Sequence, residues 1–282
     1  MNAAAETCTG KSGWLGRLEL GYEHNEGRTV LARNRHRGPL VLQRPLYPEG
    51  DAVCHSCILH PPGGVVGGDR LEIDVELKAD SCACITTPGA TKFYRSKGPL
   101  AVQKQQLRVA DGACLEWLPQ DAIIFPGARA RLETRIDLDP LALFMGWEII
   151  CLGLPVNGER FVSGTFQSRI NLYRAGRLLF RDQLPVKSEQ DLRRPSGLRN
   201  YPVTATFLVS SATEELLDII REIPATEEDA LTAATLLRHD LIVIRYLGYS
   251  TFAAQGYFAK IWSRLRPEIL RRTACTPRIW AT

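Results

Sequence analysis

The chain has 282 residues, of which 45% are hydrophobic and 23% charged, the composition of an ordinary globular protein. Its net charge of +4 is too small to indicate nucleic-acid binding. The longest apolar run, residues 141–156, is broken by Glu148, glycines and a proline, and is shorter than a membrane span. The N-terminus lacks the apolar core of a secretory signal. We therefore expect a soluble, cytoplasmic chain with neither a nucleic-acid nor a membrane partner.

Alternating apolar and polar residues predict β-strands through the first three quarters of the chain. Residues 18–22 and 29–32 flank an Asn-Glu-Gly turn, which is typical of a hairpin. Residues 71–77 and 129–138 each place apolar side chains on one face and charged side chains on the other. Residues 166–180 repeat this pattern around a second turn. Short strands separated by turns predict a mainly β fold, which we interpret as a large layered antiparallel domain.

The pattern becomes more helical after about residue 210. Residues 214–223 have apolar side chains at helical spacing. Residues 226–237 begin with a pattern that resembles a capping box and predict a second helix. Residues 241–246 are again typical of a strand, and a third helix is expected from Thr251 to just before Pro267.

These elements divide the chain into three predicted parts. Residues 1–13 form a flexible N-terminus, and residues 14–210 form the layered β domain. Residues 211–282 form a small helical α/β segment that packs on the β domain. We detect no internal sequence repeat and no low-complexity linker.

Residues 60–69, His-Pro-Pro-Gly-Gly-Val-Val-Gly-Gly-Asp, form the most unusual segment. Four glycines and two prolines exclude a regular helix or a central strand. The segment matches neither a P-loop nor a dinucleotide-binding fingerprint. Two interpretations remain for Asp69 at its end: it accepts hydrogen bonds from local backbone N–H groups in a tight turn, or it lies at the mouth or wall of a cavity.

Glu148 is the only charged residue in the apolar run at 141–156. A buried ionised carboxylate is costly unless it is paired, hydrated or bound to a cation. One interpretation is a structural ion pair with a residue such as Arg169. The other is a polar, hydrated path through the interior. Asp182 is either a similar group or an exposed residue at the end of a strand.

The cysteines and histidines do not define a known site. A Cys-His-Ser-Cys sequence at residues 54–57 precedes Cys-Ala-Cys at residues 82–84, but the second pair has the wrong spacing for a zinc site. Buried free thiols are the favoured interpretation and a structural metal the alternative. Neither H-E-x-x-H nor G-x-S-x-G occurs, so no enzymatic activity is expected.

Several long motifs together resemble the family of the urease accessory protein UreD, which is called UreH in some organisms. The resemblance is co-linear from about residue 13 to residue 282 and weakens between residues 185 and 206. The motifs that carry it are residues 60–69, 86–95, 115–121, 125–128, 146–153, 262, 265–267 and 277–280.

The resemblance implies a non-catalytic scaffold and metallochaperone for urease maturation. Such a protein binds UreF directly and the GTPase UreG through UreF, docks them on apo-urease, and helps to pass nickel to the urease active site. It also implies a mainly β fold with an internal tunnel, through which nickel(II) moves in transit without being bound stably as a cofactor. The path residues implied for this sequence are Asp69, Thr91, Glu148 and Asp182, with His60 and Asp121 as possible additions.

Oxygen ligands suit a conduit, because a dense set of His and Cys ligands would hold nickel too tightly to release it. We therefore expect the chain alone to bind nickel only weakly. One alternative is a purely structural assembly scaffold with no nickel passage. Another is an unrecognised enzyme, such as a hydrolase, that uses the glycine-rich segment.

Overall fold

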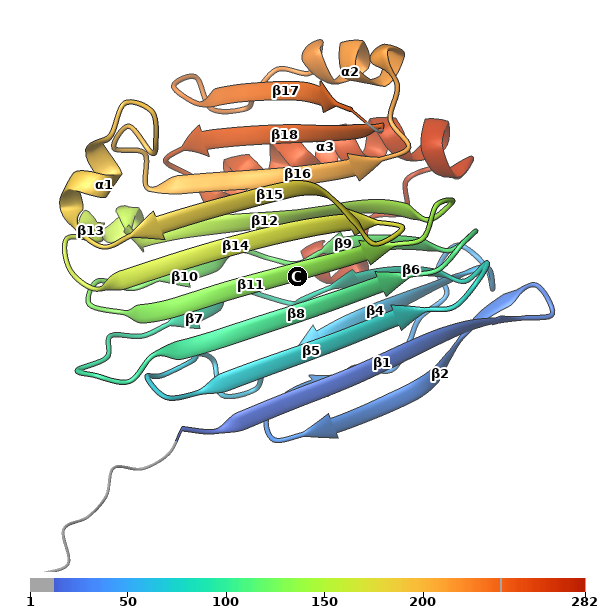
Figure 1. The fold of residues 1–282 in the computed structure, drawn as a ribbon, viewed down its shortest axis with the longest axis horizontal. Coiled ribbons are helices and arrows are strands. Elements are labelled where there is room, and N and C mark those ends of the chain that lie inside the picture. The colour runs from blue at the N-terminus through green and yellow to red at the C-terminus, as the bar shows by residue number, and fades with distance from the viewer. Residues whose placement is uncertain (1–12, 239, 282) are drawn as a thin grey trace, which may run out of the picture.

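The computed structural model describes residues 13–238 and 240–281. The predicted flexible N-terminus, residues 1–13, therefore lies outside the described part except for Gly13. The described chain is mainly β and forms two large sheets that face each other (Figure 1). Sheet 1 contains seven strands, in the order β15 (Arg177–Val186), β14 (Thr165–Arg174), β11 (Arg129–Leu138), β8 (Ala101–Val109), β5 (Arg70–Leu77), β1 (Leu15–Asn25) and β2 (Arg28–Arg37).

Sheet 2 contains eleven strands. Its main path runs β17 (Leu231–Leu237), β18 (Leu241–Gly248), β16 (Val203–Ser210), β12 (Leu143–Leu154), β9 (Cys114–Leu118), β6 (Cys82–Thr86), β4 (Val53–Leu59) and β3 (Val41–Leu42). The short strands β7 (Thr91–Phe93), β10 (Ala122–Ile124) and β13 (Glu159–Arg160) join it off this path. The helices are α1 (Glu189–Arg193), α2 (Glu214–Arg221) and α3 (Thr251–Leu270), with the 3₁₀ turns η1 (Pro155–Asn157) and η2 (Arg278–Ala281).

The prediction of an antiparallel layered domain was wrong, although the fold is mainly β. In sheet 1, β1, β5, β8, β11 and β14 pair in parallel. In sheet 2, β4, β6, β9 and β12 do the same. From β5 to β12 the chain crosses back and forth between the two sheets. In each sheet, a long strand therefore pairs in parallel with the preceding long strand of that same sheet. The architecture is solenoid-like. The alternation of apolar and polar residues did not predict it, because this alternation indicates a half-buried strand but not the direction of the neighbouring strand.

Antiparallel pairs occur mainly where the chain makes a tight turn or reaches the sheet ends. The two predicted hairpins are confirmed as β1–β2 and β14–β15. Glu26 and Gly27 have positive φ angles in the first turn, and Ala175 and Gly176 in the second. These angles match the left-handed backbone that short hairpin turns require.

The solenoid contains a structural repeat that we did not detect in the sequence. Leu71, Gln103, Leu132 and Ser168 occupy equivalent positions on four adjacent strands of sheet 1. These positions are roughly 30 residues apart, which is in the range of solenoid repeats. The residue types differ from one turn to the next, so the repeat is one of backbone geometry.

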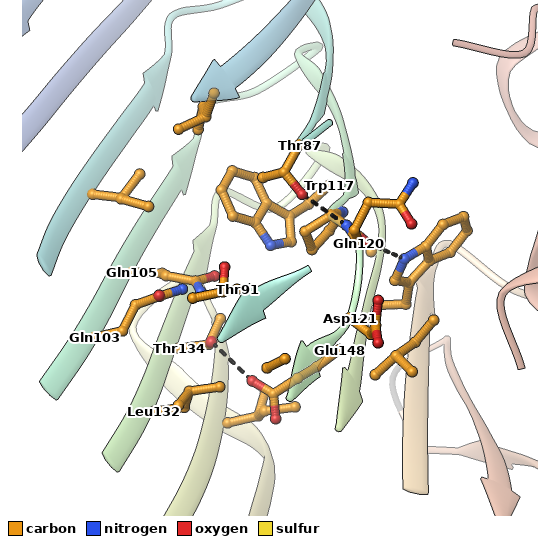
Figure 2. A pocket seen from close by; sticks show the side chains of 18 of the residues that line it. Thr87, Thr91, Gln103, Gln105, Trp117, Gln120, Asp121, Leu132, Thr134 and Glu148 are labelled. Carbon is orange, nitrogen blue, oxygen red and sulfur yellow. Dashed lines mark hydrogen bonds between the residues drawn. The ribbon is translucent and has the colours of Figure 1, made fainter. Parts of the chain in front are cut away.

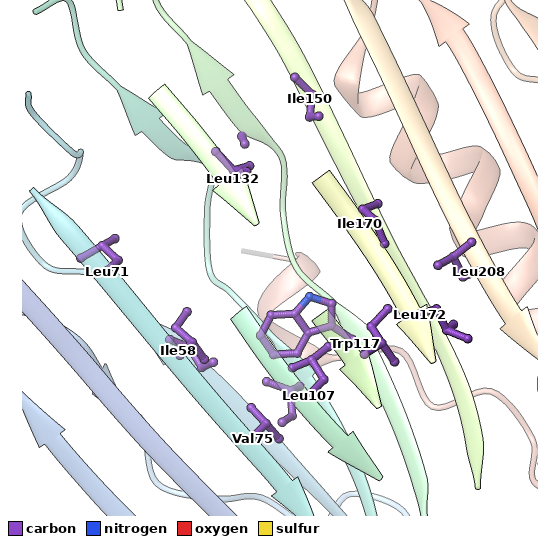
Figure 3. Packing of buried hydrophobic residues seen from close by; sticks show 14 of the residues in the cluster. Ile58, Leu71, Val75, Leu107, Trp117, Leu132, Ile150, Ile170, Leu172 and Leu208 are labelled. Carbon is purple, nitrogen blue, oxygen red and sulfur yellow. The ribbon is translucent and has the colours of Figure 1, made fainter. Parts of the chain in front are cut away.

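Two hydrophobic clusters form the core of the fold. The first lies between the sheets and includes Val75 and Leu107 from sheet 1 and Ile58 and Trp117 from sheet 2 (Figure 3). The second lies on the opposite face of sheet 2, where α3 packs through residues such as Phe258. Full burial of one large apolar side chain contributes about 1.5–3 kcal/mol, so these clusters account for much of the stability.

The C-terminal elements confirm part of the prediction. Helix α2 begins after Thr213, whose side chain accepts a hydrogen bond from the N–H of Leu216. The helix predicted at 226–237 is instead strand β17, because it pairs along β18 and extends sheet 2. Helix α3 starts at Thr251 as predicted but continues past Pro267 to Leu270. Within the described residues, no helix has both the length and the apolar character needed to span a membrane.

Candidate functional site

A cavity of about 70 Å³ lies between the two sheets (Figure 2). By this measure a single water needs roughly 10–15 Å³, so the cavity has room for several. Most of its wall is aliphatic and aromatic, as expected between two packed sheets. Its polar lining residues are Thr87, Thr91, Gln103, Gln105, Gln120, Asp121, Thr134, Glu148 and Thr206.

Strands β8 and β11 supply polar groups at positions that would otherwise be aliphatic. Gln103, Gln105 and Thr134 alternate with outward residues and therefore point into the space between the sheets. Each is at most 8% exposed. No protein partner hydrogen-bonds either glutamine amide within the described part of the chain. Since buried amides need partners, this part of the cavity is suited to water or a polar solute.

Glu148 enters the same space from β12 in sheet 2 (Figure 2). Its carboxylate accepts hydrogen bonds from the hydroxyls of Ser168 and Thr134, both on sheet 1. The ion pair considered between Glu148 and Arg169 does not form, because Ser168 occupies the inward position on β14 and Arg169 faces the other way. Glu148 therefore joins the two sheets through neutral partners only.

These surroundings raise the pKa of Glu148 to about 7. Burial is the main cause, and the negative charge of Asp182 adds to it. The hydrogen bonds from Ser168 and Thr134 act in the opposite direction but do not offset the burial. At neutral pH the group is poised between its protonated and ionised forms, so a cation entering the cavity can displace its proton.

This shift predicts a pH dependence of stability. The pKa of Glu148 is about 7 in the folded chain and ordinarily 4.5, so the folded state binds the proton more tightly. The stabilising contribution of protonated Glu148 is therefore complete below pH 4.5 and is lost as the pH rises through about 7. We expect Glu148→Gln to be more stable than the wild type at pH 8 and similar at pH 4.5. Urea unfolding of both proteins at pH 8 and pH 4.5 measures the difference in their free energies of unfolding. An equal difference at the two pH values would contradict the prediction.

Asp182 lies in a neighbouring surface pocket of about 380 Å³. It forms an ion pair with Arg245, and Arg245 also donates a hydrogen bond to Thr206 Oγ1 (2.8 Å). Glu148, Thr206 and Arg245 occupy one row across β12, β16 and β18. Glu148 and Thr206 line both this pocket and the internal cavity. They form the boundary between the interior and the surface.

Thr91 and Asp121 line another part of the cavity, on and beside the short strands β7 and β10. The N–H of Thr91 donates to the carbonyl of Asp121 (2.8 Å). Burial raises the pKa of the Asp121 carboxyl, with a smaller opposing effect from a hydrogen bond with Thr251. The half-buried residues Thr87 and Gln120 lie beside them and are joined by a hydrogen bond of 2.9 Å.

Asp69 and His60 lie outside the cavity lining. Asp69 Oδ1 accepts from the N–H of Trp14 (2.8 Å) and Oδ2 from the N–H of Val66 (3.0 Å). This is the geometry of the turn interpretation of the glycine-rich segment. Burial lowers the pKa of His60, while the nearby Asp69 raises it. Gly68 has a φ of +97°, which explains why glycine is needed next to Asp69.

The structure thus brings Thr91, Asp121 and Glu148 to one cavity and Asp182 to the pocket that shares Glu148. Sequence reasoning missed Gln103, Gln105, Thr134, Ser168, Thr206 and Arg245. A signal for two of them was present. Gln103 and Gln105 fall at alternating positions with Ala101, Leu107 and Val109, the buried face of that strand. The others depend on which strands become neighbours.

Comparison with known proteins identifies the family of the chain. The family model described as UreD urease accessory protein matches residues 15–281. The chain belongs to the UreD family of urease accessory proteins. Urease accessory protein UreD of Azoarcus sp. (strain BH72) is 46% identical over 273 residues, covering 96% of this chain and 95% of the relative. The UreD proteins of Pseudomonas entomophila (strain L48) and Alcanivorax borkumensis are 44% and 43% identical, covering 96% and 98% of this chain and 95% of each relative.

Membership in the UreD family makes this chain a urease accessory protein that takes part in urease maturation. The family match covers both large sheets and α3, and so includes every residue of the cavity. It also includes the pocket that contains Asp182.

Proposed function

We propose that this chain is a non-catalytic scaffold and metallochaperone that passes nickel to apo-urease through its internal cavity. In this proposal it binds UreF directly, recruits the GTPase UreG through UreF, and docks the assembly on apo-urease. Nickel is cargo in transit and not a resident cofactor. The path that we propose runs through the pocket at Asp182, past Glu148, to Thr91 and Asp121.

One observation carries the proposal: Glu148 borders the internal cavity on one side and the surface pocket on the other. In this proposal, an ion that moves between these spaces passes Glu148 and Thr206, the two residues that line both. Asp182 beside Glu148 supplies a second negative charge, although its ion pair with Arg245 partly neutralises that charge.

The chemistry of the lining favours passage over storage. The polar groups of the cavity are hydroxyls, amides and two carboxyls, without a cysteine or histidine among the described lining residues. Oxygen ligands bind nickel less tightly than imidazole or thiolate. The raised pKa of Glu148, about 7, means that a proton competes with the metal for the carboxylate. Both effects keep each site weak enough to release the ion.

Asp69 and His60 have a different place in this proposal. They lie outside the cavity lining, and Asp69 already accepts two backbone hydrogen bonds. We therefore place them at an entrance or docking surface of the path, at the two ends of the glycine-rich segment. Their replacement is expected to affect activation less than replacement of Glu148.

Reconstitution tests the proposal as a whole. Apo-urease is incubated with UreF, UreG, GTP and nickel, with and without this chain, and the bound proteins are recovered with a tag on the chain. We expect UreF to be recovered without UreG, UreG to be recovered only when UreF is present, and activation to require the chain. Activation of apo-urease at an equal rate without the chain would contradict the proposal.

A further inference from the structure

A second polar cluster lies on the opposite face of sheet 2, away from the internal cavity. It joins Glu49, which precedes β4, to His55 on β4 and Cys275, which follows α3. One ligand atom from each residue lies within 4.8 Å of the others. Successive side chains of a strand point to opposite faces, and Cys54 belongs to the core between the sheets. His55 therefore points away from the space between the sheets. Glu148 points inward from the same sheet, so the two sites are on different faces.

We propose that Glu49, His55 and Cys275 form a binding site for a divalent transition metal of borderline softness, Ni²⁺ or Zn²⁺. A carboxylate, an imidazole and a thiolate are ligands that such ions prefer. Bonds of roughly 2.0–2.3 Å place the ligand atoms of a tetrahedral site about 3.3–3.8 Å apart. The cluster needs only small side-chain movements to reach this geometry. Three protein ligands leave a fourth position open for water or an exchanging ligand.

Two parts of the cluster are already fixed. His55 exchanges both backbone hydrogen bonds with Leu46 (2.9 Å each), and its Nε2 lies 2.6 Å from Glu49 Oε1. Glu49 Oε1 also accepts from Arg266 Nη2 (2.7 Å). Such supporting hydrogen bonds orient ligands and strengthen metal sites. Binding replaces the contact between His55 and Glu49 by two bonds to the metal and releases the Cys275 proton to solvent.

The local charges also fit a divalent cation. The carboxylates of Glu49 and Glu116 and the guanidinium of Arg266 together carry one negative charge. The thiolate of Cys275 raises the total to two negative charges, which a divalent ion balances.

An adjacent pocket of about 340 Å³ gives access to the cluster. His55 lines it, together with Cys57 and Cys84. Arg44 and Arg278 also line it, and their charges oppose the entry of a free cation. A hard ion such as Mg²⁺ gains too little from this ligand set to overcome that repulsion, whereas Ni²⁺ and Zn²⁺ gain strong bonds to thiolate and imidazole. The site is therefore expected to be selective.

This inference is independent of the proposed nickel passage. A site with nitrogen and sulfur ligands holds metal more tightly than the oxygen-lined cavity. It also modifies our expectation that the chain alone binds nickel only weakly, because this site would bind one equivalent of nickel more tightly than the cavity does. Sequence patterns do not indicate this site, since the three ligands lie at residues 49, 55 and 275 and do not follow a known spacing.

The test uses the purified full-length chain under reducing conditions, titrated separately with Ni²⁺, Zn²⁺ and Mg²⁺. We expect one tight equivalent of Ni²⁺ or Zn²⁺, none of Mg²⁺, and a sulfur-to-nickel charge-transfer band with Ni²⁺. Loss of an outer hydrogen-bond partner typically weakens metal binding roughly 10–100-fold, so loss of the direct ligand in Cys275→Ser is expected to cost at least about 100-fold. His55→Gln should have a similar effect while keeping a donor to Glu49.

Matched variants separate the cluster from nearby thiols and from the cavity. Cys57→Ser replaces a thiol of the same pocket outside the cluster and should keep the tight equivalent. Glu148→Gln should also keep it, because Glu148 lies on the other face of the sheet. Circular dichroism and urea unfolding verify that Cys275→Ser remains folded. Unchanged affinity and an unchanged charge-transfer band in folded Cys275→Ser would overturn the inference, as would the absence of a tight equivalent in the wild type.

Discussion

Glu148→Gln is expected to lower the activation of apo-urease roughly 10–100-fold, the usual range for loss of a group that supports a metal site. Glutamine keeps the size of the side chain and its ability to hydrogen-bond Ser168 and Thr134. It removes the negative charge at the boundary between cavity and pocket. The activation rate at saturating UreF, UreG and GTP measures the effect.

The matched control is Glu133→Gln on β11. Glu133 lies beside Thr134 but faces outward, where it pairs with Lys104 (3.3 Å) on the surface. The same chemical change there should leave activation unchanged. The assembly with UreF must also be recovered equally with both variants. If Glu148→Gln instead disrupts this assembly, or activates apo-urease as fast as the wild type, Glu148 has a purely structural role.

Arg266→Met is expected to destabilise the chain by about 3–5 kcal/mol, because it leaves a buried carboxylate without its counter-charge. Arg266 and Glu116 are at most 1% exposed. The guanidinium bonds Glu116 through Nε (2.9 Å) and Nη2 (3.1 Å), and Glu49 through Nη2 (2.7 Å). Trp262 donates to Glu116 as well (2.6 Å). These contacts attach α3 to sheet 2, and the free energy of unfolding in urea measures their loss.

Two comparisons make this prediction specific. Arg264→Met on the same helix removes an exposed pair with Glu268 (3.4 Å), and it should cost less than about 1 kcal/mol. Adding Glu116→Gln to Arg266→Met removes the unpaired charge and should recover part of the lost stability. Equal effects of Arg264→Met and Arg266→Met would show that the buried pair does not anchor the helix.

Much of the fold was predictable from local patterns. The alternation at residues 71–77 and 129–138 correctly predicted β5 and β11, and the turns at 25–27 and 174–177 correctly predicted two hairpins. These features depend on neighbouring residues only. The direction of pairing does not, because a strand with one buried face packs equally well beside a parallel or an antiparallel neighbour.

The errors at the C-terminus have the same origin. Residues 226–237 carry a local helix signal, but pairing of β17 along β18 outweighs it. Pro267 was expected to end α3, yet the helix continues for another turn, and the N–H of Arg271 still donates to the Pro267 carbonyl (3.1 Å). Arg266 anchors this turn to Glu116. Tertiary contacts, which local patterns do not contain, decide both cases.

The site was predictable only in part. Glu148 was identifiable because a charge in an apolar run needs a partner. Its partners Ser168 and Thr134 were not, because they come from strands that become neighbours only in the folded solenoid. Asp69 has an equally clear sequence signal, but the structure places it in a turn outside the cavity. A conspicuous motif indicates a constrained backbone, and the constraint can be structural.

The nickel content of urease after activation tests the central claim most directly. Apo-urease is incubated with complexes of equal composition that contain the wild type, Glu148→Asp or Glu148→Gln, and is then separated and analysed for bound nickel. The proposed passage predicts that the wild type transfers the most nickel, Glu148→Asp an intermediate amount, and Glu148→Gln little above the level without the chain. Equal nickel in urease from all three complexes would contradict passage through the cavity.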